Sequence, residues 1–329
     1  MNPQEAKKLE KKIHKIFAKY LSKNNTVIAG ISGGPDSIFL LKFLAEFPIK
    51  IHVAHLNHLL RKESGNDEKL VKDFTEKLNE KLDNNAISFH SKSVDIKKIS
   101  KKSKKGIEET GRAERYKFFN QLAKKHKATF IITAHHADDN LETILLNLTR
   151  GATLQGLTGM KTLDTNLLRP LLPITKAQIQ DYLKFKRIPF IIEKSNLTDE
   201  YNRNLIRNKA IPHLKKINPN IALTTTKNTE NLREIQDYLA IQAQNWLKHH
   251  STKSSTKLPA KSLTKLHPAL QKTILRELYK SLTGDTKNLE NTHINEILHL
   301  ISQNIGNKQK KFGKLLLTLK NNSITIKKL

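Results

Sequence analysis

Apolar residues follow two different periods along the first two thirds of the chain. Four short runs, rich in β-branched residues, have the composition of strands that are buried in a sheet. The longer segments between them place apolar residues every three or four positions, as amphipathic helices do. The predicted strands are 26–31, 49–56, 85–94 and 128–136. This alternation of strand and helix predicts an α/β fold, a parallel sheet with helices on both faces.

The periodicity changes in the last third of the chain. Residues 229–250 and two later segments have helical spacing, whereas 251–260 is expected to be a loop. The chain then alternates like two strands around the Asn321–Asn322 turn. We therefore expect a first domain over 1–214 and a smaller, mostly helical C-terminal domain over 215–329 that ends in a β-hairpin.

The charge of the chain is strongly positive. Its 59 Lys and Arg residues against 30 Asp and Glu residues give a formal net charge of +29. This excess indicates a polyanionic partner, and nucleic acid is the favoured one. A general lysine-rich bias of composition is the alternative explanation for part of the excess. The lysines within 97–105 are expected to lie in a solvated loop.

The chain contains no cysteine. Disulfides, thiolate zinc sites, iron–sulfur clusters and cysteine nucleophiles are therefore excluded. No apolar run approaches the roughly 20 residues of a membrane span, and the N-terminal segment lacks the apolar core of a signal peptide. We expect a cytoplasmic protein that has no membrane partner.

A glycine-containing loop separates the first predicted strand from the following helix. In a parallel sheet such a loop lies at the carboxyl edge, where backbone N–H groups and a helix N-terminus attract anions. Asp36 in this loop would repel a phosphate unless Mg²⁺ lay between them. A glycine turn followed by a helix cap is the alternative interpretation. The predicted phosphate-binding residues are Ser32, Gly33, Gly34, Pro35, Asp36 and Ser37.

This loop, SGGPDS, resembles the pyrophosphate-binding loop of the PP-loop ATP-pyrophosphatase superfamily. Five further motifs occur in an order and spacing similar to those of tRNA(Ile)-lysidine synthases, over essentially the whole first domain. The motifs are HLNHLLRKES (55–64), IEETGRAERYKFF (107–119), TAHHADDNLETILLNLTRGATLQGLTGM (133–160), LLRPLLP (167–173) and YNRNLIRNKAIPHL (201–214).

The resemblance implies an adenine nucleotide α-hydrolase-like fold and a reaction in two steps. ATP, with Mg²⁺, would adenylate the oxygen on carbon 2 of the wobble cytidine in the CAU-anticodon isoleucine tRNA. Free lysine would then displace AMP to form lysidine, which changes the specificity of the tRNA from methionine to isoleucine. The C-terminal domain would help to position the tRNA, and the chain would be a short form of the family. A homodimer is a further expectation.

The segment HHADDNLET supplies the acidic residues for a lysine site. Asp139 and Glu142 lie three positions apart and share a helix face. The resemblance implies that they bind the lysine substrate, whereas the plain alternative is that they complement the helix dipole. A lysine amine has a pKa of about 10.4, so it must lose a proton before it attacks. His135 or a carboxylate is expected to act as the base.

Two pairs of arginines have helical spacing. Arg112 and Arg115 would stabilise the charge that develops on the α-phosphate, unless they form surface ion pairs with Glu108 or Glu109. Arg203 and Arg207 would contact the tRNA, with Arg207 reaching the anticodon loop; the alternative is a solvated helix face.

The chain departs from the family pattern at one place. Glu193 stands three residues before Asn196, where the family usually has Asp.

Two other functions remain as alternatives. A 2-thiolating relative would use the same adenylation, but such enzymes depend on cysteines that this chain lacks. A tRNA-binding protein without catalysis would explain the charge but not the glycine loop with its acidic partners. The sequence therefore favours ligation of an amine.

Overall fold

The computed structural model describes residues 1–60, 64–82, 87–191, 202–250, 257–284, 286, 289–303 and 308–328. Glu193 and Asn196 lie outside this described part.

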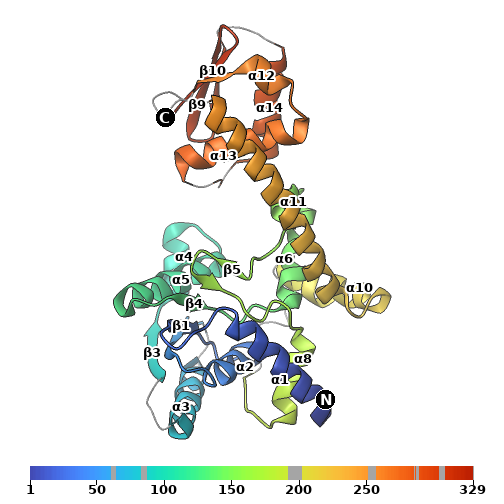
Figure 1. Ribbon diagram of the computed structural model, residues 1–329. Helices are drawn as coiled ribbons and strands as arrows, with labels where there is room; N and C mark the ends of the chain where they lie inside the picture. The colour runs from blue at the N-terminus through green and yellow to red at the C-terminus, as the bar shows by residue number, and fades with distance from the viewer. Residues whose placement is uncertain are drawn as a thin grey trace. The chain divides into compact units, whose positions relative to one another are not determined.

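The chain forms two compact units (Figure 1). Unit 1 combines Met1–Gly151 with Gly159–Asn228, and unit 2 combines Ala152–Thr158 with Thr229–Leu329. The division falls within helix α11 (Ile221–His250), later in the chain than the boundary expected after residue 214. The assignment of separate roles to 1–214 and 215–329 stays a prediction.

Unit 1 contains a six-stranded sheet of order β3-β2-β1-β4-β6-β5. All neighbouring strands pair in parallel except β5 and β6, so the predicted fold class is confirmed. The two short strands β5 and β6 were not predicted, because two residues are too few to show a period. The strands are β1 (Thr26–Gly30), β2 (Lys50–Asn57), β3 (Ile87–Ser93), β4 (Phe130–Ile132), β5 (Leu163–Asp164) and β6 (Leu167–Leu168).

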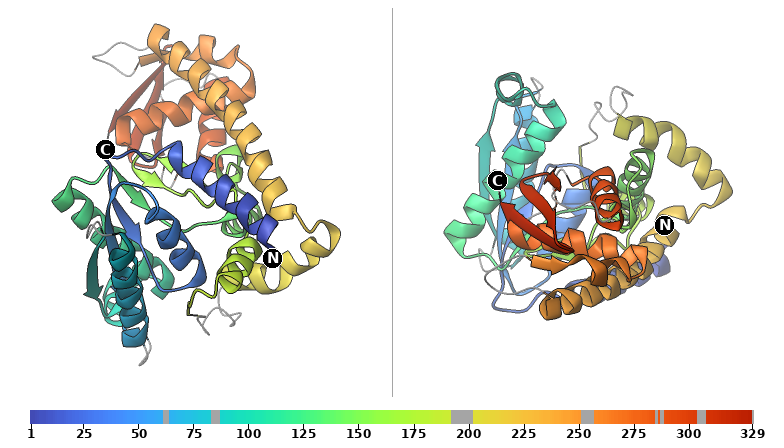
Figure 2. Two further views of the ribbon diagram at one scale, coloured as in Figure 1. Left: turned by 60° about the horizontal axis from the view of Figure 1, so that its bottom comes forward. Right: turned by 90° about the horizontal axis from the view of Figure 1, so that it is seen from above.

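Helices cover both faces of this sheet, and the views in Figure 2 show α3 along β2 and β3. A short π-helical segment, Ile206–Ala210, lies between α9 and α10. The helices of unit 1 are α1 (Pro3–Ala18), α2 (Pro35–Leu44), α3 (Ser64–Leu82), α4 (Ile96–Ser103), α5 (Ile107–His126), α6 (Ala137–Thr149), α8 (Lys176–Phe185), α9 (Asn202–Leu205), α10 (Ile211–Ile217) and the start of α11.

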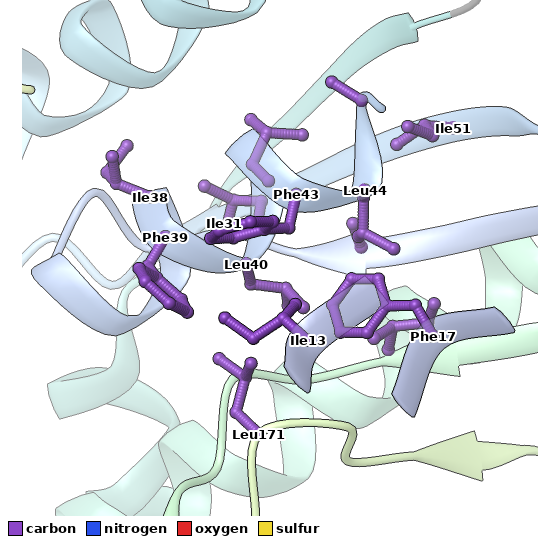
Figure 3. Close-up of a cluster of buried hydrophobic side chains, with 14 of the residues drawn as sticks. Ile13, Phe17, Ile31, Ile38, Phe39, Leu40, Phe43, Leu44, Ile51 and Leu171 are labelled. Atoms are coloured by element: carbon purple, nitrogen blue, oxygen red, sulfur yellow. The ribbon is translucent and has the colours of Figure 1, made fainter. Parts of the chain in front are cut away.

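Successive side chains of β1 enter different cores because strand side chains alternate between faces. Val27 and Ala29 are buried in a cluster with α1, α2 and α8. Figure 3 shows part of this cluster, in which Ile13 and Phe17 of α1 pack near α2. Ile28 belongs instead to the cluster formed with α5. The central strand is therefore buried on both sides, as the apolar run predicted.

The expectation of a solvated lysine loop over 97–105 was wrong for most of that segment. Helix α4 covers Ile96–Ser103, and its N-cap Asp95 accepts a 2.9 Å hydrogen bond from the backbone N–H of Lys98. Ile96 and Ser100 face inward, while the lysines between them are exposed. The many lysines concealed the helical period, which is defined by only two buried positions four residues apart, Ile96 and Ser100.

Unit 2 packs helices against a four-stranded antiparallel sheet of order β7-β10-β9-β8. The predicted hairpin is confirmed: Asn321 and Asn322 have φ of 51° and 56°, the left-handed pair that a tight hairpin turn requires. The elements are α7 (Leu154–Leu157), the rest of α11, α12 (Ala260–Thr264), α13 (Pro268–Thr283), α14 (Asn291–Ser302), β7 (Lys257–Pro259), β8 (Lys308–Phe312), β9 (Leu315–Lys320) and β10 (Ser323–Lys328).

The loop expected over 251–260 contains strand β7, which is a correction. Leu258 lies opposite Ile324 of β10 and is fully buried. Long-range pairing, which a three-residue pattern does not reveal, makes this segment a strand. None of the helices in the described part of the chain has the length and apolar character needed to cross a membrane.

Candidate active site

The glycine loop connects the end of β1 to the start of α2, at the carboxyl edge of the sheet. Gly33 has a φ of +94°, a left-handed conformation that glycine adopts without strain. The Ser37 hydroxyl accepts hydrogen bonds from the backbone N–H groups of Ser32 at 3.2 Å and Gly33 at 3.1 Å. It also donates to the carbonyl of Gly34 at 2.9 Å. The Ser37 hydroxyl therefore binds three backbone groups of the loop and stabilises its curved conformation.

His136 links this loop to helix α6. Its Nε2 atom lies 3.6 Å from Asp36 Oδ2 and 3.4 Å from Asp139 Oδ2. The backbone N–H of His136 also donates to Asp139 Oδ2 at 3.0 Å. The structure thus brings together Asp36 from the loop and Asp139 from the acidic motif. His136 was not assigned a role from the sequence, although its position next to the predicted His135 was a usable signal.

The environment of His136 favours its charged form. Burial lowers the pKa of His136, but the carboxylates of Asp139, Asp36 and Asp138 outweigh burial and raise it to about 9. The imidazolium is therefore present at neutral pH, where it offsets part of the acidic charge around it. In turn, burial raises the pKa of Asp139 while the charge of His136 lowers it, and the net shift is downward.

The neighbouring His135 has the opposite character. Burial lowers its pKa to about 4, against the influence of Asp139 and with help from the positive charges of Arg169, Arg112 and Arg203. Its Nδ1 atom lies 2.8 Å from the hydroxyl of Thr133. The predicted base His135 is therefore a neutral imidazole at neutral pH.

Glu142 is only 2% exposed and binds two arginines. Arg207 donates from Nε to Oε1 at 2.6 Å and from Nη2 to Oε2 at 2.8 Å, and Arg203 donates from Nε to Oε2 at 2.9 Å. The Nη2 atoms of both arginines lie 3.7–3.8 Å from Asp139 Oδ1. The residues predicted to bind lysine and those predicted to bind tRNA thus form a single network of ion pairs.

Asp138 lies in the same turn of α6 but has a different role. Its Oδ2 atom accepts a 2.8 Å hydrogen bond from the backbone N–H of Lys176, and its Oδ1 atom binds the ammonium of Lys215. These contacts connect α6 to the start of α8 and to α10. Asp138 therefore positions the helix that carries Asp139 and Glu142.

Arg112 and Arg115 lie on an exposed face of α5. Arg115 donates from Nη2 to His58 Nε2 at 3.2 Å, while Arg112 lies over the ring of Tyr116 at 5.1 Å. Burial, followed by the charge of Arg115, lowers the pKa of His58 to about 4, so His58 is neutral and accepts this hydrogen bond. The contact holds Arg115 close to the end of β2, and Arg112 is near enough to His135 to affect its pKa.

Arg169 is a site residue that the sequence reasoning did not single out. It follows β6, is 7% exposed and donates from Nη1 to the carbonyl of Lys161 at 2.8 Å. Its Nε atom is buried and has no hydrogen-bond partner. The motif LLRPLLP contained the available signal, namely one charged residue between apolar positions.

Asn140 positions the segment around Met160, which follows the acidic motif in the sequence. It is fully buried, and its Oδ1 atom accepts a 2.7 Å hydrogen bond from the backbone N–H of Met160. Gly159 has a φ of +61°, and a Cβ atom there would lie 2.4 Å from Asn140 Oδ1. Both its conformation and its close approach therefore require glycine at this position.

Comparison with known proteins identifies the family of this chain. Residues 5–214 match the family model of the PP-loop domain. The tRNA(Ile)-lysidine synthase of Chlorobaculum tepidum is 36% identical over 260 residues, which are 76% of this chain and 74% of that protein. The chain belongs to the tRNA(Ile)-lysidine synthase family. The expected membership of this family is thus confirmed.

Two further similar proteins are matched over only part of their own length. The tRNA(Ile)-lysidine synthase of Clostridium tetani is 33% identical over 288 residues, or 85% of this chain, and the chain spans 60% of that relative's length. Among solved structures, the U34-tRNA thiolase NcsA from Methanococcus maripaludis with its [4Fe-4S] cluster has a TM-score of 0.58 at 18% identity, covering 70% of this chain and 80% of the thiolase. The likeness to the thiolase supports only the fold of this lysidine synthase family member.

Proposed function

We propose that the chain joins lysine to carbon 2 of the wobble cytidine in the CAU-anticodon isoleucine tRNA, through an adenylated cytidine. The observation that carries this proposal is the proximity of Asp36 to the acidic motif. Asp36 and Asp139 both approach His136 Nε2, at 3.6 Å and 3.4 Å. A nucleotide held by the loop and an amine held by the acidic motif would therefore meet at one place.

In the first step, the oxygen on carbon 2 of cytosine attacks the α-phosphorus of ATP, and the bond to the pyrophosphate oxygen breaks. Ser32–Ser37 would bind the departing pyrophosphate through N–H and hydroxyl groups. Arg112 and Arg115 would stabilise the negative charge on the α-phosphate. Both side chains come from α5, whose buried face packs against β1.

The loop also fits a magnesium ion accompanying ATP. Asp36 Oδ1 is buried and has no hydrogen-bond partner, so a carboxylate oxygen is left to bind a cation. Mg²⁺ prefers oxygen ligands and takes one or two carboxylates together with phosphate oxygens. Asp36 would hold the ion, which would neutralise part of the phosphate charge.

In the second step, the ε-amine of lysine attacks carbon 2, the bond from this carbon to the adenylated oxygen breaks, and AMP leaves. Asp139 and Glu142 would bind the ammonium groups of lysine before the reacting amine loses its proton. With a pKa of about 4, His135 is a weak base. We therefore assign His135 the role of a neutral hydrogen-bond partner that orients the amine, and the other expected base, a carboxylate of the acidic motif, would accept the proton that the ammonium loses.

Lysine binding would exchange partners within the ion-pair network. Glu142 already binds Arg203 and Arg207. A lysine ammonium that pairs with Glu142 would compete with these guanidinium groups. A guanidinium displaced in this way could contact a phosphate or base of the anticodon loop, as expected for Arg203 and Arg207 from the sequence. The lysine and tRNA sites would then be coupled through one carboxylate.

The proposed partners are this tRNA, ATP and free lysine, with a net charge of +29 available for the RNA. A cytoplasmic location, where tRNA occurs, and a homodimer remain part of the proposal.

Incorporation of radiolabelled lysine tests the proposed function. The full chain is incubated with ATP, Mg²⁺, labelled lysine and a transcript of the isoleucine tRNA with a CAU anticodon. We expect label in this tRNA and none in a methionine tRNA transcript with the same anticodon. Without lysine, slow release of pyrophosphate should continue and should depend on the tRNA. Pyrophosphate release without label incorporation would contradict lysine ligation, and the absence of both would reject the whole reaction.

A further inference from the structure

Three histidines gather in unit 1 outside the candidate active site. His52 belongs to β2, His90 to β3, and His126 is the last residue of α5. His90 lies opposite Ala54, two residues after His52, so the side chains of His52 and His90 leave the sheet on the same face. The packing of α5 against this sheet brings His126 to them, although the three residues are far apart in the sequence.

The imidazole nitrogens of this triad converge. His52 Nδ1 lies 3.0 Å from His90 Nε2. The rings of His52 and His126 are stacked, with centroids 3.8 Å apart. One nitrogen from each ring can be chosen so that all three atoms lie within 4.8 Å of one another. His126 Nε2 is buried and has no hydrogen-bond partner. His126 Nε2 therefore carries a lone pair or an N–H group that makes no hydrogen bond and lies beside two other imidazoles.

We propose that His52, His90 and His126 bind a divalent transition metal ion of the zinc class. Nitrogen ligands at 2.0–2.1 Å in a tetrahedral site are about 3.4 Å apart, close to the separation of His52 from His90. The stacked ring of His126 must turn so that its lone pair also points to the ion. Three imidazoles and a water would complete the four positions. Because the triad has no carboxylate, it suits Zn²⁺ or Co²⁺ better than Mg²⁺ or Ca²⁺, which need oxygen ligands.

The surroundings of His52 and His90 favour neutral imidazole rings. Burial, followed by the neighbouring His126 and His90, lowers the pKa of His52 to about 4. Burial and His126 likewise lower the pKa of His90. Metal ions bind neutral imidazole. One of the two rings, His52 or His90, donates the hydrogen bond between them. To bind a metal ion, this ring would carry its proton on the other ring nitrogen. The nearby ammonium groups of Lys50 and Lys125 belong to exposed residues.

The position of the triad indicates a structural role for the metal. His52 is the third residue of β2, and His126 ends the helix that leads into β4. Both therefore lie toward the amino ends of the parallel strands, whereas the glycine loop follows the carboxyl end of β1. A bound ion would connect two strands to α5, and we expect it to stabilise unit 1 against unfolding.

Metal titration of the full chain tests this site. Equilibrium dialysis with Zn²⁺ alone is compared among the wild type, His90→Gln, His126→Gln and the control His249→Gln, which changes an exposed histidine of α11. The wild type and the control should bind one more equivalent than either triad variant. Zn²⁺ should raise the melting temperature of the wild type and the control but not that of the triad variants. Equal stoichiometry and affinity in all four proteins would overturn the proposal.

A second measurement does not depend on the folding of the variants. Co²⁺ is added to the wild type, and the imidazole signals are observed by nuclear magnetic resonance. Selective broadening of His52, His90 and His126 would support the site, together with a visible absorption band of tetrahedral cobalt. Broadening confined to other histidines, such as His135 and His136, would overturn it.

Discussion

Arg207 binds Glu142 through two parallel hydrogen bonds, from Nε to Oε1 at 2.6 Å and from Nη2 to Oε2 at 2.8 Å. Arg203 adds a third hydrogen bond, and Glu142 is almost completely removed from water. A carboxylate in this position depends on its guanidinium partners because it has lost its hydration. The geometry therefore makes Glu142 important both for the stability of unit 1 and for the proposed lysine site.

We expect Glu142→Gln to lower the free energy of unfolding by about 3 kcal/mol, because it removes the carboxylate that two partly buried guanidinium groups bind most closely and leaves them only the longer contacts to Asp139. Urea denaturation followed by far-ultraviolet circular dichroism measures this change. The matched control is Glu109→Gln, which removes an exposed ion pair with Lys105 at 3.4 Å and should cost less than about 1 kcal/mol. Equal losses in the two variants would contradict the importance of the buried pair.

The carboxylate of Asp36 should be required for the first step of the proposed reaction. Asp36→Asn preserves the shape of the side chain but removes its charge, and we expect tRNA-dependent pyrophosphate release to fall at least about a hundredfold. Asp181→Asn changes an exposed residue of α8 and should leave the rate unchanged. Retention of the full rate in Asp36→Asn would show that the loop does not use this carboxylate.

The raised pKa of His136 should make stability depend on pH. Because its pKa is about 9 in the folded state and about 6.5 when unfolded, the protonated ring stabilises the fold fully below pH 6.5. This contribution should be lost as the pH rises from 6.5 through 9. Urea denaturation across this range should show a smaller decline in His136→Asn than in the wild type. Identical declines would place the alkaline sensitivity elsewhere.

Gly159 should tolerate a side chain less well than Gly151. Both have positive φ, +61° and +70°, but a Cβ atom at Gly151 would meet no atom within 4 Å. Gly151→Ala should therefore cost only the strain of the left-handed conformation, about 1 kcal/mol. Gly159→Ala adds a collision with Asn140 Oδ1 and should cost about 2–3 kcal/mol in thermal or urea unfolding. Equal costs would mean that Asn140 moves aside freely.

Much of the fold followed from local patterns in the sequence. The strand-helix alternation predicted the parallel sheet because each buried strand and each amphipathic helix carries its own period. The Asn321–Asn322 pair predicted the terminal hairpin because Asn tolerates the left-handed conformation of such a turn. Strand β7 and the short strands β5 and β6 did not follow, because pairing with distant segments defines them. Helix α4 was obscured by its exposed lysines.

For the candidate site, the sequence by itself determined the chemical groups: a glycine loop with Asp36, an acidic motif with Asp139 and Glu142, and the family motifs that accompany them. Only the tertiary structure decided how these groups are paired. Arg203 and Arg207 are 61 and 65 residues from Glu142, and folding joins them in one buried network. The pKa values of the adjacent residues His135 and His136 are shifted in opposite directions. Burial lowers the pKa of both rings, but folding places three carboxylates around His136 and three arginines near His135.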